Sequence, residues 1–296
     1  MSSAVTRRLI AGCIAGILAS AALSPGATAD DLADRGRYLA AAAGCVSCHT
    51  GDREGAEPFA GGRALVTSFG TFYSPNITPD RETGIGTWTD ADFLAALHEG
   101  RSPSGEAYFP AFPFTAYTGM TREDALALKA WLFSVAPVRQ ANRPHDLPWY
   151  LRWRLAARAW QWLYFAPGRF APDGGRDEAW NRGAYLVRHL GHCGECHTPR
   201  NLLGALLAER EMAGNPQGPE DRSVPNVTPD EADGIGEWSL SDLETFLEIG
   251  MFPDGDFAGS GMGQVIEENT SRLTPEDRRA IATYLRSLPP RPGAAP

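Results

Sequence analysis

Cysteine and methionine are scarce in this chain of 296 residues, with five of each. No P-loop, dinucleotide-binding fingerprint or Ser/His/Asp set is evident, so the sequence gives no support to an activity that depends on one of them. The formal net charge is −9 at pH 7. This acidic balance argues against binding of nucleic acid or anionic lipid through a basic face of a globular domain.

The N-terminus has the pattern of an export signal rather than of a membrane span. Arg7-Arg8 precede the apolar run Leu9–Leu23, which is too short to cross a bilayer, and Ala27-Thr28-Ala29 matches a cleavage site. We therefore predict that residues 1–29 are a signal peptide and that the mature protein is periplasmic. Cleavage there would remove Cys13 and leave four cysteines.

These four cysteines lie in two stretches of the same form, Cys45-Val46-Ser47-Cys48-His49 and Cys193-Gly194-Glu195-Cys196-His197. Each is a C-x-x-C-H pentapeptide, the attachment sequence of a c-type haem. The two thiols bind one edge of the porphyrin, and the histidine that follows binds the iron. A zinc half-site or a redox C-x-x-C explains two such copies less well. We predict two covalently bound haem c groups, held by Cys45, Cys48, His49, Cys193, Cys196 and His197.

Repeated sequence around these motifs indicates a tandem duplication. Residues 74–100 recur as residues 224–250 at a constant offset, with about twelve of twenty-seven positions identical. In each copy a hydroxyl residue (Thr89 or Ser239) precedes a predicted helix of ten residues that a glycine closes. The predicted helices are Asp90–Glu99 and Leu240–Ile249. The chain is therefore expected to contain two similar units.

Each unit is predicted to begin with a helix that contains an unusual glycine, Gly36 or Gly183. Glycine destabilises a helix interior, so a matched pair predicts that another helix approaches closely at that point. Each unit is predicted to end with an amphipathic helix that carries a large aromatic residue, Trp131 or Tyr284.

This order of elements resembles the class I cytochrome c fold, whose terminal helices cross glycine against aromatic. More narrowly, Tyr108–Pro113, His192–Arg200 and the repeated P-N-[IV]-T-P-D…G-I-G-x-W segments resemble the cytochrome c subunits of periplasmic alcohol, aldehyde, gluconate and related dehydrogenases. The resemblance covers residues 32–135 and 178–289. It implies an all-α fold, with two tandem class I-like domains joined by a partly helical linker.

The predicted boundaries after the signal peptide are a first domain at 30–136, a linker at 137–178, a second domain at 179–290 and a tail at 291–296. Within the linker, Trp149–Phe165 is rich in Trp, Arg, Leu and Ala and carries only basic charges. As a helix it would be amphipathic. Two interpretations stay open: a connecting helix packed between the haem domains, or a docking surface for a catalytic or membrane partner, including a peripheral membrane contact.

The resemblance implies a methionine as the second axial ligand of each iron. In the second unit, Met262 lies in a glycine-rich stretch that we expect to be a flexible loop ahead of the last helix. Met262 is therefore the predicted ligand, Met251 is the alternative, and Met212 is expected to be an ordinary packing residue.

The first unit departs from the resembled pattern, because Phe112 stands where related subunits often have methionine. Met120 is the predicted ligand there, and the alternatives are His98 or an iron that is open or bound to water. If it is not a ligand, His98 is expected to be exposed at the end of its helix. The remaining histidines are predicted to be surface or loop residues; they are His145, His189 and His192.

The resemblance also implies supporting roles for two pairs of residues. Trp88 and Trp238 would pack against the haem and donate to a propionate, with plain core tryptophans as the alternative. Pro75 and Pro225 would each place a backbone carbonyl against the N–H of the iron-binding histidine.

Two haems in one exported chain predict electron transfer from a partner dehydrogenase to an oxidase or another cytochrome of the respiratory chain, without an enzymatic activity of its own. The alternative is a dihaem enzyme, such as a peroxidase or a thiosulfate-oxidising cytochrome. Such an enzyme needs one iron that is open to substrate and nearby acid–base groups. A redox or gas sensor is a third, weaker interpretation.

Overall fold

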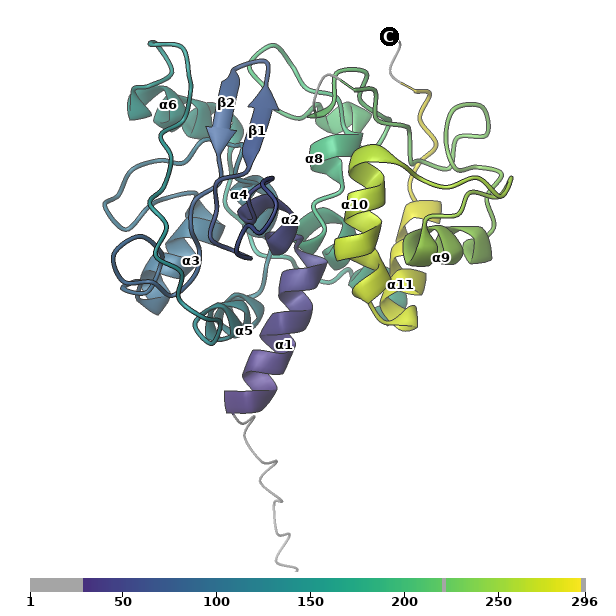
Figure 1. Ribbon diagram of the computed structural model, residues 1–296. Coiled ribbons are helices and arrows are strands. Elements are labelled where there is room, and N and C mark those ends of the chain that lie inside the picture. The colour runs from purple at the N-terminus through teal and green to yellow at the C-terminus, as the bar shows by residue number, and fades with distance from the viewer. Residues whose placement is uncertain (1–28, 220–221, 294–296) are drawn as a thin grey trace, which may run out of the picture.

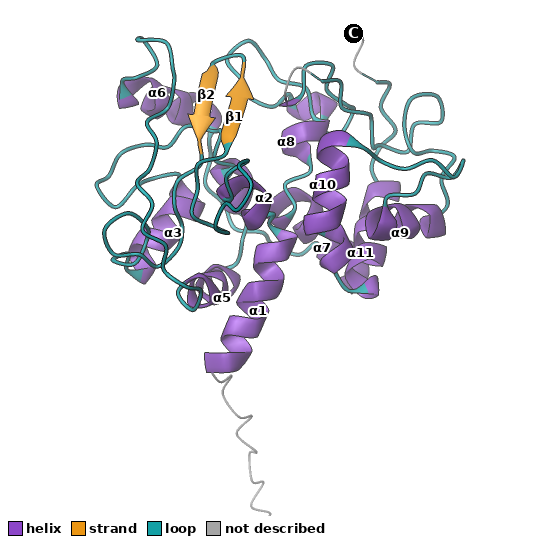
Figure 2. Ribbon diagram, viewed as in Figure 1, coloured by secondary structure: helices purple, strands orange, loops and turns teal. Residues whose placement is uncertain are grey.

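The computed structural model describes residues 29–219 and 222–293, and these residues are mostly helical (Figures 1 and 2). Residues 1–28, which hold nearly all of the predicted signal peptide, lie outside the described residues. Within the described ranges, no helix is long and apolar enough to span a membrane.

The first half of the molecule (residues 30–136) is built from five helices and one hairpin, all found in its described residues. The helices are α1 (Ala29–Ala42), α2 (Cys45–His49), α3 (Asp90–Glu99), α4 (Phe114–Tyr117) and α5 (Arg122–Leu132). The hairpin consists of β1 (Ala64–Thr67) and β2 (Gly70–Tyr73). It is the one small sheet drawn in Figure 2, and the all-α prediction did not include it.

The hairpin lies between the first C-x-x-C-H motif and the repeated segment at residues 74–100, where no helix or strand is predicted. The segment A-L-V-T-S-F-G-T-F-Y is rich in β-branched and aromatic residues, which favour strands. The strands pair antiparallel, with Ala64 opposite Tyr73. The outer edge of β2 is covered by the connecting segment, since the N–H of Thr71 donates to the carbonyl of Asp146 and the N–H of Asp146 donates back, each at 2.9 Å.

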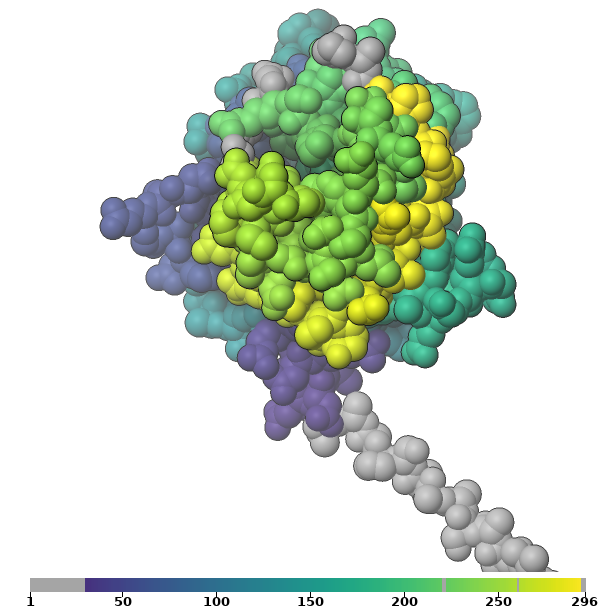
Figure 3. Space-filling view, turned by 90° about the vertical axis from the view of Figure 1, so that its right-hand side faces the viewer, coloured from purple at the N-terminus to yellow at the C-terminus, as the bar shows by residue number. Residues whose placement is uncertain are grey.

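The second half (residues 179–290) repeats the helices of the first in the same order. Its described helices are α7 (Glu178–Tyr185), the π-helical segment Leu186–Leu190, α8 (Gly194–His197), the 3₁₀ turns Ala208–Arg210 and Thr270–Arg272, α9 (Leu240–Ile249), α10 (Ser260–Glu268) and α11 (Pro275–Arg286). In the side view of Figure 3 this half faces the viewer, and α1 (purple) lies below it.

The repeated helices α3 and α9 have the predicted bounds. Thr89 accepts a hydrogen bond from the N–H of Asp92, whose carboxylate binds back to the Thr89 N–H, and Ser239 and Asp242 form the same capping box. Both helices end at a glycine in the left-handed conformation, as predicted. These ends agree with the prediction because capping depends only on residues close in sequence.

The predicted close approach of another helix at Gly36 and at Gly183 is also confirmed. A methyl group on Gly36 would lie 2.0 Å from the carbonyl oxygen of Ala127 in α5 and 2.7 Å from the Cβ of Trp131. A methyl group on Gly183 would lie 2.0 Å from the carbonyl oxygen of Ala280 in α11. The first and last helix of each half therefore touch backbone to backbone, which only glycine permits.

Helix α6 (Arg154–Tyr164) in the connecting segment is shorter than the predicted Trp149–Phe165. The residues before it form turns, because the N–H of Leu151 donates to the carbonyl of Pro148. The inner face of α6 contacts both halves: Gln161 donates to the carbonyl of Gly100 and the Trp160 indole donates to the carbonyl of Leu203, each at 2.8 Å. The packed connecting helix is confirmed for this inner face.

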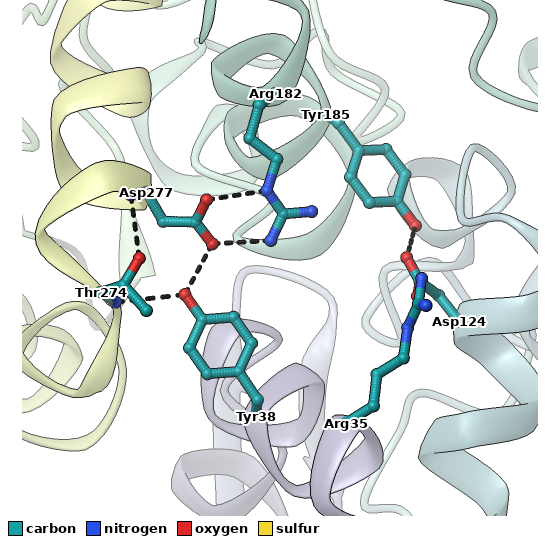
Figure 4. Close-up of polar contacts among 7 residues, drawn as sticks. All are labelled: Arg35, Tyr38, Asp124, Arg182, Tyr185, Thr274 and Asp277. Carbon is teal, nitrogen blue, oxygen red and sulfur yellow. Dashed lines mark hydrogen bonds and ion pairs between the residues drawn. The ribbon is translucent and has the colours of Figure 1, made fainter. Parts of the chain in front are cut away.

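Two matching sets of polar contacts join the halves (Figure 4). In the first set, Asp277 of α11 binds Arg182 of its own half at 2.6 Å. The hydroxyl of Tyr38, from α1 of the other half, donates to the same carboxylate at 2.6 Å. Although burial opposes it, these hydrogen bonds lower the pKa of Asp277.

The second set reverses the roles of the halves. Asp124 of α5 binds Arg35 of its own half at 2.8 Å, and the hydroxyl of Tyr185, from α7, donates to Asp124 at 2.7 Å. Burial raises the pKa of the Tyr185 hydroxyl, so this group stays a donor. Each half thus inserts one tyrosine beside a buried aspartate of the other, and the two halves are related as by an approximate two-fold rotation.

Candidate haem-binding sites

The four predicted haem-binding cysteines lie on two short helices. Cys45 and Cys48 are on α2, and Cys193 and Cys196 lie at the start and within α8, three residues apart and therefore on one helix face. No disulfide joins these four cysteines. Before haem is attached, burial raises the pKa of the Cys45 and Cys193 thiols to about 12, which keeps them protonated at neutral pH.

The histidine of each motif is oriented by a proline carbonyl. His49 Nδ1 lies 2.8 Å from the Pro75 oxygen, and His197 Nδ1 lies 2.8 Å from the Pro225 oxygen. Because a carbonyl can only accept, Nδ1 carries the proton and Nε2 keeps a lone pair for a metal. Burial lowers the pKa of both histidines, which favours the neutral ring. The predicted proline contacts are confirmed, and both sites fit a haem iron.

A buried asparagine next to each proline fixes this arrangement, and the sequence analysis missed it. Asn76 accepts from both the N–H and the hydroxyl of Thr78, at 2.9 and 2.7 Å. Asn226 does the same for Thr228, at 2.8 Å for both bonds. Asn76 also donates to the carbonyl of Val138, which ties the loop to the chain beyond the last helix. The recurrence of P-N-[IV]-T was the signal that could have identified these residues.

The sequence of this chain is similar to those of known cytochromes. The sequence model of the family "Cytochrome c" matches residues 33–136. A "Diheme cytochrome c-type" protein of Cereibacter sphaeroides is 44% identical over 266 residues, which cover 87% of this chain and 86% of that protein. The chain belongs to the dihaem c-type cytochromes. Haem c is therefore the group that the two C-x-x-C-H sites imply.

This cytochrome is also similar to subunits of larger systems. The "Gluconate 2-dehydrogenase cytochrome c subunit" of Pantoea cypripedii is 40% identical over 94% of this chain and 64% of its own length. The "Alcohol dehydrogenase (quinone), cytochrome c subunit" of Gluconacetobacter polyoxogenes is 39% identical over 93% of this chain and 60% of its own. The cytochrome thus spans under two thirds of these relatives. The resemblance to dehydrogenase cytochrome subunits is confirmed, and these are electron-carrier subunits.

In the second half of the cytochrome, the candidate ligand Met262 lies on helix α10 and is half-buried. The prediction of a flexible loop is wrong there, because Gly259 takes the N-cap position and its carbonyl accepts from the N–H of Gly263. Met251 is half-buried in a short bridge to Phe257. Met212 is 1% exposed within the core, in agreement with a packing role. Ligation by Met262 stays a prediction.

In the first half, both candidate ligands are buried beside each other. Met120 is fully buried, His98 is 3% exposed, and the ring of His98 is hydrogen-bonded to the Met120 backbone. The expectation of an exposed His98 is wrong, since the loops around Thr118 and Arg169 cover the end of α3. Burial lowers the pKa of His98 to about 4. Its Nε2 has no hydrogen-bond partner among the described residues.

Met120 has a counterpart that does not bind metal. Leu273 directly precedes Thr274 as Met120 precedes Thr121, and both side chains are buried in the core. The position therefore takes a buried apolar side chain in either half. Ligation by Met120 stays a prediction, with His98 as the neighbouring alternative.

The remaining predicted residues have mixed outcomes. His145 lies in a loop of the connecting segment, as predicted, and is half-buried. The prediction of a surface or loop residue is wrong for His189, which is half-buried in the π-helical segment Leu186–Leu190. His145 accepts from the N–H of Tyr73 at 3.1 Å, and His189 Nδ1 lies 3.0 Å from the carbonyl oxygen of Ala116 in the other half. His192 is in a loop but is also half-buried. The sequence could not show these contacts, because their partners are distant in the chain.

Trp88 and Trp238 are half-buried, and their predicted contacts with haem remain predictions. The indole of Trp238 packs edge-on against Phe246, with 5.4 Å between ring centroids, and against Phe252 at 5.9 Å. Aromatic packing of this kind also suits a core tryptophan.

Proposed function

We propose that this cytochrome binds two haem c groups covalently and transfers electrons from a periplasmic dehydrogenase to an oxidase or another cytochrome of the respiratory chain. When bound, haem c supplies one-electron Fe(III)/Fe(II) chemistry. The observation that carries the proposal is the pair of C-x-x-C-H helices, each with a histidine fixed by a proline carbonyl at 2.8 Å.

The residues of the chain perform positioning tasks in this function. Each half serves as one class I cytochrome c domain, at residues 30–136 and 179–290, with residues 137–178 as the linker. The proline carbonyls fix the orientation of the His49 and His197 rings by accepting from Nδ1, so that Nε2 would be free to bind the iron of each haem. Met262 and Met120 would close the sixth positions, which favours electron transfer over binding of substrate.

The partners follow from the relatives. A cytochrome subunit of gluconate or quinone alcohol dehydrogenase is similar over more than nine tenths of this chain. A dehydrogenase of small alcohols, aldehydes or sugar acids is therefore the proposed electron donor. Export through removal of residues 1–29 would place the protein in the periplasm.

The alternative, a dihaem enzyme, rests on the first half. Phe112 cannot bind iron, and the position of Met120 is occupied by a core leucine in the second half. If neither Met120 nor His98 were a ligand, one iron would be open to substrate.

The test is spectroscopy of the purified holoprotein, oxidised and reduced. We expect two haems per chain, low-spin signals only and a near-infrared Met–Fe(III) band at the intensity of two haems. Addition of the catalytic subunit of a quinone alcohol or gluconate dehydrogenase with its substrate should reduce both. A high-spin signal from one haem, or carbon monoxide binding to the reduced protein, would favour the dihaem enzyme instead.

A further inference from the structure

The connecting segment carries an exposed aromatic surface that neither haem-binding site uses. Trp149, Trp153 and Trp162 expose 72%, 68% and 84% of their area. Leu155 and Leu163 are exposed beside them on α6, by 70% and 57%. An indole is rarely left so open to water, and three of them within fourteen residues make a surface that suits a binding partner.

Most exposed residues of α6 lie on one side of the helix, and hydrogen bonds on the opposite side hold the helix against the two halves. Leu155, Ala159 and Trp162 follow each other at helical spacing on the outer side. On the inner side Ala157 is buried, and Gln161 and Trp160 donate the two hydrogen bonds to the halves described above. A rotation of the helix that buried the outer residues would break both bonds.

The exposed surface continues into the second half. Trp160 is bonded to the carbonyl of Leu203, and Leu202 and Leu203 are themselves 97% and 54% exposed. We call the whole surface the linker face. It consists of Trp149, Tyr150, Trp153, Leu155, Trp162, Leu163, Leu202 and Leu203.

The charges of the connecting segment at this surface have one sign, although Glu106 of the first half lies 3.9 Å from Arg154. Between Leu147 and Pro172 the chain has four arginines and no aspartate or glutamate, although the whole chain has a net charge of −9. Arg152 and Arg158 are exposed, and Arg154 lies over the ring of Phe109. Net charge therefore disfavours anionic partners at the two acidic halves but not at the linker face.

We propose that the linker face binds peripherally to an anionic lipid bilayer. Indoles and leucines would enter the interfacial region while the arginines contact lipid phosphates, which is the composition of interfacial helices. A fluid bilayer accommodates separate projecting side chains from three segments, whereas a protein partner would need a matching rigid shape. The proposal rests on the proposed export of an electron carrier. It would orient α6 and the hairpin toward the membrane and α1 away from it (Figure 1).

The experiment is flotation of the full mature holoprotein with vesicles of phosphatidylglycerol and phosphatidylcholine, or of phosphatidylcholine alone. We expect binding to the anionic vesicles that weakens with added salt. The double variant Arg152→Gln/Arg158→Gln should bind about twenty-fivefold more weakly, at about fivefold per arginine near a charged surface. Trp153→Ser/Trp162→Ser should lose about tenfold or more.

Two matched controls are available on other surfaces. Phe257 is 58% exposed in the second half, and Arg37 is exposed on α1. Phe257→Ser and Arg37→Gln should bind vesicles as the wild type does. All variants change exposed side chains, so haem content and circular dichroism should stay unchanged and separate binding from folding.

The outcomes distinguish this proposal from the proposed function. Wild-type protein that stays with the unbound fraction, or linker-face variants that float as well as wild type, would overturn lipid binding. If these variants instead lose reduction by the dehydrogenase in vesicle-free solution, the face binds protein, and electron transfer still stands. Vesicle binding by a protein that no dehydrogenase reduces would support the lipid surface and contradict the proposed donor.

Discussion

The two halves of this cytochrome have matching contacts around the motif histidine of each candidate haem site. They differ around the candidate sixth ligand. Three features around the motif histidines occur in both halves: the proline carbonyls at 2.8 Å, the asparagines bound to a threonine, and the glycines at the helix crossings. These groups act through the backbone and set the orientation of the histidine ring. The duplication has kept the part of the site that requires exact geometry.

The candidate sixth-ligand residues show no such agreement. His98 is buried, and its Nε2 has no partner in the part of the chain that the structure describes, while Glu248 at the corresponding position of α9 pairs with Arg278 at 2.8 Å. Met262 is half-buried on a glycine-started helix, while Met120 is fully buried before a helix cap. Burial and hydrogen bonding around a haem tune its potential. Two irons held alike by histidine are therefore expected to have different potentials.

The largest effect on stability should come from a larger side chain at one of the two glycines where helices cross. Gly183→Val would drive a side chain into the Ala280 carbonyl, and we expect a loss of more than about 3 kcal/mol of unfolding free energy. Gly36→Val should act equally in the first half. Thermal denaturation measures both, and Gly168→Ala is the control, because nothing lies within 4 Å of its added methyl group. If only one of the two valine variants kept its stability, the helix crossings of the two halves would not be equivalent.

The methionines test where the halves differ. Met120→Ala should remove part of the near-infrared band and also destabilise the fold by about 2–5 kcal/mol, because Met120 is fully buried. Met262→Ala should remove the other part at a smaller loss of stability, since this side chain is half-buried. If Met120→Ala lowers stability and leaves the spectrum intact, then Met120 is a core residue like Leu273. His98→Ala would then be the variant to examine.

The tyrosines test the contacts that join the halves. Tyr38→Phe and Tyr185→Phe each remove one hydrogen bond to a buried carboxylate, so each should lower the unfolding free energy by about 1.5 kcal/mol. Equal losses in chemical denaturation would support the approximate two-fold relation. The exposed Tyr150→Phe should be neutral, and a double variant no weaker than either single one would contradict two independent contacts.

The smallest effect concerns acid stability at Asp277. Its pKa is lowered in the folded state, so it contributes stability above the ordinary aspartate pKa of about 4 that is lost as pH falls through the lowered value. Asp277→Asn should therefore be less stable at neutral pH and should lose less on acidification below about pH 4. Denaturation at several pH values measures this slope. An unchanged slope would show that Asp277 does not carry the acid sensitivity.

Features that depend on neighbouring residues could be predicted from the sequence. The capping boxes at Thr89 and Ser239 and the motif helices follow from side chains that reach only a few residues along the chain. The start of α6 was missed, because the turn at Pro148 competes with the helical pattern from Trp149 onward. Met262 was placed in a loop because its glycines disfavour a helix, and tertiary packing outweighs that preference.

The sequence by itself determined the chemistry of this protein. The C-x-x-C-H pentapeptides, the repeat and the matched glycine and aromatic residues can be recognised in the sequence alone, and they identify a dihaem cytochrome. Only the tertiary structure decided how the halves meet. The reciprocal tyrosine contacts, the burial of His98 and the exposure of Trp162 join or separate residues that are far apart in the chain. Such contacts depend on how whole helices pack, and no short pattern encodes that.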